Sequence, residues 1–136
     1  MALVGKLFSF SPQPMRLHSG EYSQFRIDCD DLAGSDWDVL AKLVDESGIT
    51  FCEVYSVPTG GDHFANALKQ YIDKDSDTVL VVDDVYTTGS SMEAMKREVT
   101  LVGTSAKIAQ GIVVFARRQT PEWIFPIFDA SRWKWQ

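Results

Sequence analysis

The stretch that most constrains how this chain can fold is residues 79–92, with the sequence VLVVDDVYTTGSSM. Its short aliphatic run is typical of a strand buried in a parallel sheet, and two carboxylates, Asp83 and Asp84, follow at once. Open α/β sheets bind ligands where such strands end. A segment rich in hydroxyls then opens a helical pattern, and the free N–H groups at a helix start attract phosphate. The stretch therefore predicts an anion-binding site at the end of a central strand.

Length and composition limit the possible classes of protein. The 136 residues correspond to one domain with one core, so we expect a single domain over residues 1–136. No stretch approaches the roughly 20 apolar residues that span a bilayer, and residues 1–10 show no export signal. Cys29 and Cys52 fit neither a metal site nor a disulfide framework, which favours a cytoplasmic location.

The net charge of −6 argues against nucleic acid as a partner, because binding a polyanion needs a basic field. A small anionic ligand remains compatible with this charge. Local donors and a few cations suffice for such a ligand, and a divalent metal can offset nearby carboxylates.

Strands and helices alternate along the middle of the chain. Phe25 and Ile27 share one face of a short N-terminal strand, and Ser35 and Asp62 are candidate caps of the first two helices, with Gly48 as a stop. This order predicts a three-layer α/β fold with a mainly parallel sheet flanked by helices. The expected strands are 51–57, one that begins near Thr78 and ends at the Asp pair, and 107–115, and the expected helices are about 36–47, 62–71 and 90–102.

Four segments resemble one family. Residues 79–92 resemble the phosphoribosyl pyrophosphate (PRPP) signature of type I phosphoribosyltransferases. LHSG at 17–20, followed by Ser23, Phe25 and Asp28, is similar to the LKSG and SPY segment of orotate phosphoribosyltransferases. VPTGG at 57–61 resembles the pyrophosphate loop, and RRQ at 117–119 resembles the DRQ that borders the orotate site. The landmarks follow the family order.

The resemblance implies a transferase that joins the ribose 5-phosphate of PRPP to a nitrogenous base and releases pyrophosphate, in nucleotide biosynthesis or salvage. PRPP and a nucleobase would be the substrates. Mg²⁺ would be the cofactor, held through PRPP near the Asp pair without an assigned protein ligand. The implied roles are catalysis at the ribose by Asp83 and Asp84; 5′-phosphate binding by Thr87, Thr88, Gly89, Ser90 and Ser91; pyrophosphate binding by Thr59, Gly60 and Gly61; and base binding by His18, Phe25, Arg118 and Trp123.

The C-terminal tail holds three of the four tryptophans, so we expect it to act as a flap or sheet cover that buries apolar area. Two alternatives stay open. The exposed aromatics would form a homodimer surface, or, as the family resemblance implies, Trp123 or Phe125 would line a base-binding site. The same resemblance implies that the two ends of the chain, about residues 1–34 and 117–136, form a small hood.

The chain also departs from the family. Only about six residues connect Tyr71 to Thr78, where the family has a strand and a long mobile loop that carries cationic side chains. His18 replaces the usual lysine, and Gly60 stands where some relatives have one. Compensating charge is expected from Arg16, Arg26, Arg117 or Arg118, or from a neighbouring subunit. Two functions follow: an orotate phosphoribosyltransferase-like enzyme, or a non-catalytic PRPP or nucleotide sensor or regulator on the same fold.

Overall fold

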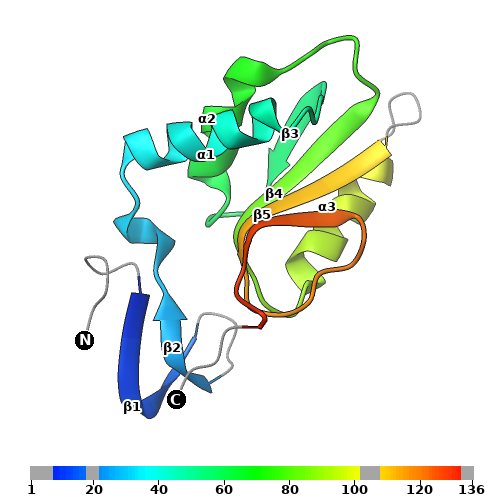
Figure 1. The fold of residues 1–136 in the computed structure, drawn as a ribbon. Helices are drawn as coiled ribbons and strands as arrows, with labels where there is room; N and C mark the ends of the chain where they lie inside the picture. The colour runs from blue at the N-terminus through cyan, green and yellow to red at the C-terminus, as the bar shows by residue number, and fades with distance from the viewer. Residues whose placement is uncertain (1–7, 18–21, 102–107, 133–136) are drawn as a thin grey trace.

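The main sheet is parallel and has the strand order β3-β4-β5-β6. A computed structural model describes residues 8–17, 22–101 and 108–132 (Figure 1). The strands are β1 (Phe8–Arg16), β2 (Tyr22–Ile27), β3 (Glu53–Ser56), β4 (Thr78–Tyr86), β5 (Ile108–Ala116) and β6 (Ile124–Asp129). The helices are α1 (Gly34–Glu46), α2 (Asp62–Leu68) and α3 (Ser90–Leu101), with short 3₁₀ turns η1 (Cys29–Asp31) and η2 (Lys69–Tyr71). The expected α/β class is confirmed.

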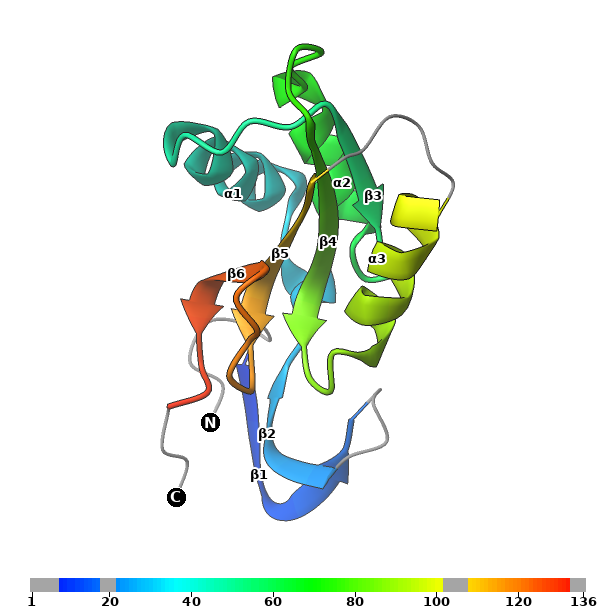
Figure 2. The same ribbon diagram turned by 90° about the vertical axis from the view of Figure 1, so that its right-hand side faces the viewer.

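Helices cover both faces of the sheet. Successive residues of a strand point to opposite faces, so β4 and β5 each supply two cores. Leu80, Val82, Ile112 and Val114 pack on the side of α1 and α2, whereas Val81 and Val113 pack with Met92 of α3. Figures 1 and 2 show α1 and α2 on one side of the sheet and α3 on the other. The continuous aliphatic run of β4 is explained by this burial on both faces.

The helix caps differ from those expected. Ala33, rather than Ser35, is the N-cap of α1, because its N–H donates to the Asp36 carboxylate at 2.8 Å. The N-cap of α2 is Gly61, and Asp62 instead accepts a hydrogen bond from the Ser56 hydroxyl at 2.7 Å. The stop after α1 is as expected, since Gly48 has a φ of +87°, where glycine is favoured.

The N-terminal segment forms an antiparallel hairpin of β1 and β2, whose register shifts between Phe10 and Met15. In Figure 2 this hairpin lies beyond the carboxyl ends of the parallel strands. We call β1 and β2 the hood hairpin. It lies at the end of the sheet where α/β proteins bind ligands.

The C-terminal stretch corrects one expectation. We assigned residues 117–136 to the hood, but β6 pairs in parallel with β5 from Gly111↔Ile124 to Ala116↔Asp129 and extends the main sheet. Aromatic residues stabilise this pairing, since the rings of Phe115 and Phe128 stack with centroids 5.2 Å apart. Residues 124–129 of the tail are therefore part of the sheet.

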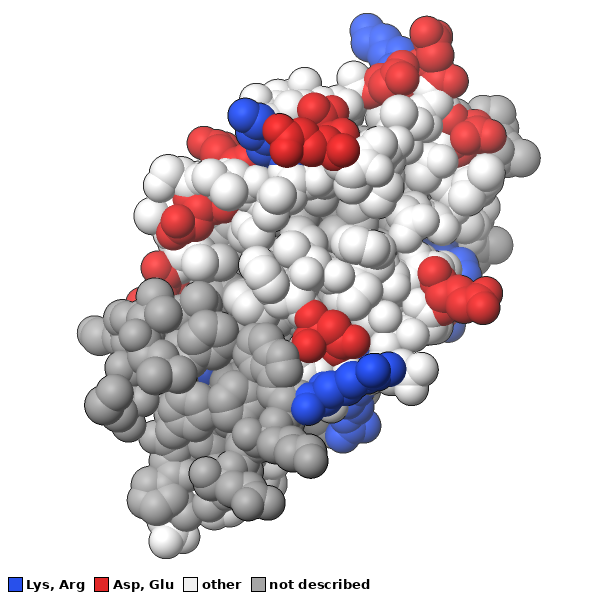
Figure 3. All heavy atoms as spheres, in the orientation of Figure 1, with Lys and Arg blue, Asp and Glu red and all other residues white. Residues whose placement is uncertain are grey.

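Among the described helices, none is long and apolar enough to cross a membrane. On the face shown in Figure 3, acidic side chains lie over α1 and at the end of the molecule remote from the hood hairpin, and the basic side chains in view are few and scattered.

Candidate functional site

A cavity of about 420 Å³ lies between the hood hairpin and the carboxyl ends of β3 and β4. Three groups of residues line it. The loop after β3 supplies Val57, Pro58, Thr59 and Gly60; the end of β4 and the start of α3 supply Asp83, Asp84, Val85, Thr87 and Ser91; and the hood side supplies Leu17, Arg26, Ile27, Asp28, Cys29 and Arg117. The cavity therefore joins residues from all four of the segments that the sequence singled out.

Asp83 and Asp84 both line this cavity although they are neighbours on β4. Side chains of neighbouring strand residues ordinarily point to opposite faces of the sheet. The sequence alone therefore did not show whether the two carboxyl groups could act on the same ligand. Their carboxylates accept local backbone bonds instead: the Asp84 N–H donates to Asp83 Oδ1 at 2.8 Å, and the Val85 N–H donates to Asp84 Oδ1 at 2.7 Å. Both carboxyl groups can therefore contact the same ligand.

Burial raises the pKa of Asp83 to about 8, and the hydrogen bond and negative charge of Asp84 act in the same direction. Asp83 therefore keeps its proton at neutral pH when no cation is bound. A protonated carboxyl group both donates and accepts hydrogen bonds, which suits a diol or a phosphate oxygen.

The loop after β3 packs directly on the Asp pair. A Cβ on Gly60 would lie 2.6 Å from Asp84 Oδ1, and a Cβ on Gly61 would lie 2.6 Å from the Val82 carbonyl oxygen. Glycine is therefore required at both positions for this close approach. The peptide bond between Pro58 and Thr59 is cis. Thr59 and Gly60 line the cavity, whereas Gly61 is buried behind them.

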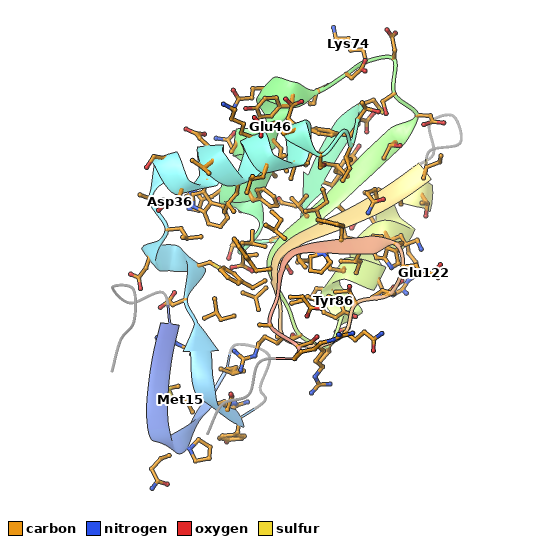
Figure 4. All side chains as sticks on the ribbon, viewed as in Figure 1. Met15, Asp36, Glu46, Lys74, Tyr86 and Glu122 are labelled. Atoms are coloured by element: carbon orange, nitrogen blue, oxygen red, sulfur yellow. The ribbon has the colours of Figure 1, made fainter. Side chains whose placement is uncertain are left out.

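The turn between β4 and α3 presents hydroxyls to the same cavity. Gly89 has a φ of +83° and lies so close to Tyr86 that a Cβ would come within 2.5 Å of the phenol oxygen. Figure 4 shows Tyr86 where β4 ends. Thr87 and Ser91 line the cavity, while Thr88 and Ser90 join their hydroxyls at 2.9 Å beside it. The first turn of α3 therefore adjoins the site.

Two arginines line the cavity from the hood side. Arg26 of β2 forms an ion pair with Asp28 at 3.3 Å, and Arg117 Nη2 donates to Ser23 Oγ at 2.8 Å. The sequence weighed both as compensating charges, and Arg117 also lies in the RRQ segment that resembles the family's DRQ. No spacing signal joins them, because the fold alone brings β2 and the end of β5 together.

Among the residues that the structure describes, the expected base-binding residues do not line the cavity. Trp123 is not among the residues that line the cavity; it packs with Met92 of α3, donates from Nε1 to Glu93 at 2.8 Å and lies under Lys96. Its aromatic surface is used for packing, and its role in base binding stays a prediction. Arg118 is exposed and also does not line the cavity, and its role in base binding stays a prediction as well. Phe25 lies in β2, but its side chain, like the whole of His18, is outside the described residues.

The residues of this site fit a Mg²⁺ ion that is bound partly by the protein and partly by the substrate. The described residues hold no cluster of three or more histidine, cysteine or carboxylate groups able to bind a metal ion. Two adjacent carboxylates on a cavity wall do fit Mg²⁺, which commonly takes one or two carboxylates and completes its shell with substrate phosphates and water. Asp83 and Asp84 are therefore the residues that would hold it.

No family model and no curated protein matches this sequence. Solved structures do match. An orotate phosphoribosyltransferase from Aeropyrum pernix superposes with a TM-score of 0.72 at 20% identity, over 93% of this chain and 89% of that one. The orotate phosphoribosyltransferase of Mycobacterium tuberculosis H37Rv, in complex with inorganic phosphate, gives 0.64 at 18% identity, over 93% and 90%. The Francisella tularensis enzyme gives 0.57 at 17%, over 86% and 69%.

The chain therefore has the fold of the orotate phosphoribosyltransferases, which are type I phosphoribosyltransferases. The resemblance seen in the four sequence segments is confirmed at the level of the fold.

Proposed function

We propose that this protein binds PRPP and transfers its ribose 5-phosphate to a nitrogenous base, in the manner of an orotate phosphoribosyltransferase. The observation that carries the proposal is the convergence of the β3 loop, the Asp pair and the β4–α3 turn on one cavity. The same segments resemble, in the sequence, the pyrophosphate loop and the PRPP signature. The orotate phosphoribosyltransferases that share the fold give the proposal its reaction class.

The chain's own residues have separable tasks in this reaction. Thr87 and Ser91, next to the N-terminus of α3, bind the 5′-phosphate through hydroxyl and backbone donors. Thr59 and Gly60 bring backbone close to the pyrophosphate. The ionised carboxylate of the Asp pair accepts hydrogen bonds from the ribose hydroxyls and stabilises the positive charge that grows on the sugar as pyrophosphate leaves. Fixing the ribose between these segments contributes orientation.

Mg²⁺, held by Asp83 or Asp84 together with PRPP oxygens, would supply neutralisation of the leaving pyrophosphate.

A second candidate is a PRPP or nucleotide sensor without turnover. The specific observation in its favour is the connection of residues 72–77, which joins η2 directly to β4. It lies at the amino end of β4 (Figure 1), whereas the residues that line the cavity lie at the carboxyl end of that strand. This connection therefore contributes no closing segment, and binding without catalysis is the consequence to test.

A calorimetric experiment tests the shared claim of both candidates. Asp83→Asn combined with Asp84→Asn keeps the shape of both side chains but removes their charge. We expect PRPP binding in the presence of Mg²⁺ to weaken at least about 100-fold, because charge-assisted hydrogen bonds at both carboxylates are lost. The matched control is Asp73→Asn with Asp75→Asn, in the exposed turn remote from the cavity, which should bind PRPP normally. Equal PRPP affinity of the Asp83/Asp84 variant and the wild type would refute the site.

A release assay then separates enzyme from sensor. The wild type is mixed with PRPP, Mg²⁺ and orotate, uracil, hypoxanthine, guanine or adenine in turn, and pyrophosphate is measured. Release with one base, abolished in the double Asn variant, supports the transferase. PRPP binding without release across the whole panel supports the sensor.

A further inference from the structure

The hood side of the cavity holds Arg26 and Arg117, and among the described residues no other lysine or arginine lines it. They come from β2 and from the end of β5, which are remote in sequence. The sheet side holds Asp83 and Asp84. Both arginines therefore lie on the hood side, together with Asp28, whereas the described sheet side offers carboxyl groups and no cation.

Arg26 is only partly used within the protein. Its guanidinium makes a single contact, at 3.3 Å from Nη2 to Asp28 Oδ2, although such a group has five donors. Its Nε is buried and has no hydrogen-bond partner. A buried donor without an acceptor is unfavourable, and native structures rarely keep one without a reason. An anion that enters the cavity would supply the missing acceptor.

Arg117 is held in position by two bonds at its two ends. Its backbone N–H donates to the Tyr86 carbonyl at 2.9 Å, which ties it to the end of β4. Its Nη2 donates to Ser23 Oγ at 2.8 Å, which ties its guanidinium to β2. Ser23 and Arg26 belong to the same strand, β2, and both arginines line the cavity.

We propose that Arg26 and Arg117 form an oxyanion-binding pair that binds a negatively charged oxygen group of the substrate. The group is either the pyrophosphate of PRPP or a carboxylate on the acceptor base. This inference rests on the proposed function, because it assigns one end of that substrate pair to the hood. The planar guanidinium suits both groups, since carboxylate and phosphate oxygens accept two parallel N–H bonds. The two arginines bring positive charge to a cavity whose sheet side carries the carboxyl groups of Asp83 and Asp84.

Calorimetry on the full chain tests the pair with four probes in the presence of Mg²⁺: PRPP, pyrophosphate, orotate and uracil. Orotate and uracil differ by one carboxylate. Arg26→Gln and Arg117→Gln should each weaken binding of the anionic group at least about 10-fold, as expected for the loss of a charge-assisted hydrogen bond. Arg26→Lys should give an intermediate loss, because it keeps the charge without the planar fork. Arg97→Gln, an exposed change on α3 outside the cavity lining, is the matched control and should bind all probes normally.

The probes identify the source of the oxyanion. Weakened binding of PRPP and pyrophosphate, with unchanged orotate binding, assigns the pair to pyrophosphate. Weakened binding of orotate, with unchanged pyrophosphate and uracil binding, assigns it to a base carboxylate. Wild-type affinity of both Gln variants for all probes overturns the pair, and the proposed function then stands on its own if PRPP still binds.

Failure of the proposed function has a different signature, because the wild type would then not bind PRPP at all. In that case pyrophosphate and orotate still test the pair directly. If the wild type binds neither of them, the pair is overturned. Thermal unfolding followed by circular dichroism shows whether each variant is folded. If Arg26→Gln unfolds, Arg26→Lys decides the outcome, with wild-type affinity for all probes again overturning the pair.

Discussion

Gly60, in the loop after β3, packs against the Asp84 carboxyl group of β4, so a single carbon atom added to the glycine would displace that group. A Cβ there would lie within 2.8 Å of all three atoms of the carboxyl group. Since a side-chain end can swing aside, Gly60→Ala should leave the free energy of unfolding within about 1 kcal/mol of wild type. PRPP binding should nevertheless weaken at least about 10-fold, because Asp84 is displaced from the cavity. Calorimetry and urea unfolding of the same sample measure both effects.

Gly34→Ala is the matched control, because a Cβ on Gly34 meets nothing within 4 Å and lies at the start of α1. It should bind PRPP as the wild type does. If Gly60→Ala binds PRPP with unchanged affinity, Asp84 does not act from the position that the structure gives it.

At the scale of elements, the hood hairpin and the sheet are the two walls of one cavity. A ligand that contacts both should therefore reduce local opening of β2, although it leaves distant elements unchanged. We expect amide hydrogen exchange in β2 to slow when PRPP and Mg²⁺ are added, together with exchange in the loop after β3 and the first turn of α3. Exchange in η2, on the far side of the molecule, should not change. Slower exchange in the β3 loop without any change in β2 would show that the ligand does not reach the hood.

The sequence predicted some elements well and missed others for a physical reason. The buried run of β4 and the helical stripes of α1 and α3 are local patterns, so they could be read directly. β1 and β6 were missed because both contain proline, which disfavours a strand assignment: Pro12 and Pro14 in β1, and Pro126 in β6. Both strands lie at the edge of their sheets, where proline is tolerated.

For the site, as for the fold, the sequence predicted the residues that belong to local motifs and missed those that only the fold brings together. Asp83, Thr87 and Gly60 belong to contiguous motifs, and the structure brings them to one cavity. Arg26 and Arg117 could not be assigned in advance, because their proximity depends on how the hairpin lies against the end of β5. The packing of Trp123 against α3 could not be predicted, because an aromatic ring in a tail has the same sequence signature whether it packs on a helix or lines a ligand site.

At the scale of the whole molecule, the protonation of Asp83 links the fold to pH. Its pKa is about 8 in the folded protein and near 3.8 in the unfolded chain, so the folded state binds the extra proton between these values. The contribution of Asp83 to the free energy of unfolding therefore falls as pH rises from about 4 to 8. Asp83→Asn should remove this fall and gain stability relative to wild type at pH 8, on the order of a few kcal/mol. Urea unfolding across this pH range in EDTA measures the difference.

Asp129→Asn is the control for this measurement. Hydrogen bonds from Ser131 lower the pKa of Asp129, so its stabilising contribution is present above the unfolded pKa and is lost only as pH falls through the folded value. This variant should keep the wild-type fall between pH 4 and 8. If Asp83→Asn keeps it too, the extra proton is not on the Asp pair.

The turn that joins η2 to β4 also offers a practical handle. Asp73, Lys74 and Asp75 are exposed, and the turn is anchored by the Asp73 N–H, which donates to the Phe51 carbonyl at 2.8 Å. Exposed turns with such firmly held flanks are the positions where inserted sequence is tolerated best. A fluorescent reporter or an immobilisation tag placed between Lys74 and Asp75 would therefore project from the end of the molecule opposite the cavity, and leave the ligand's route of entry clear.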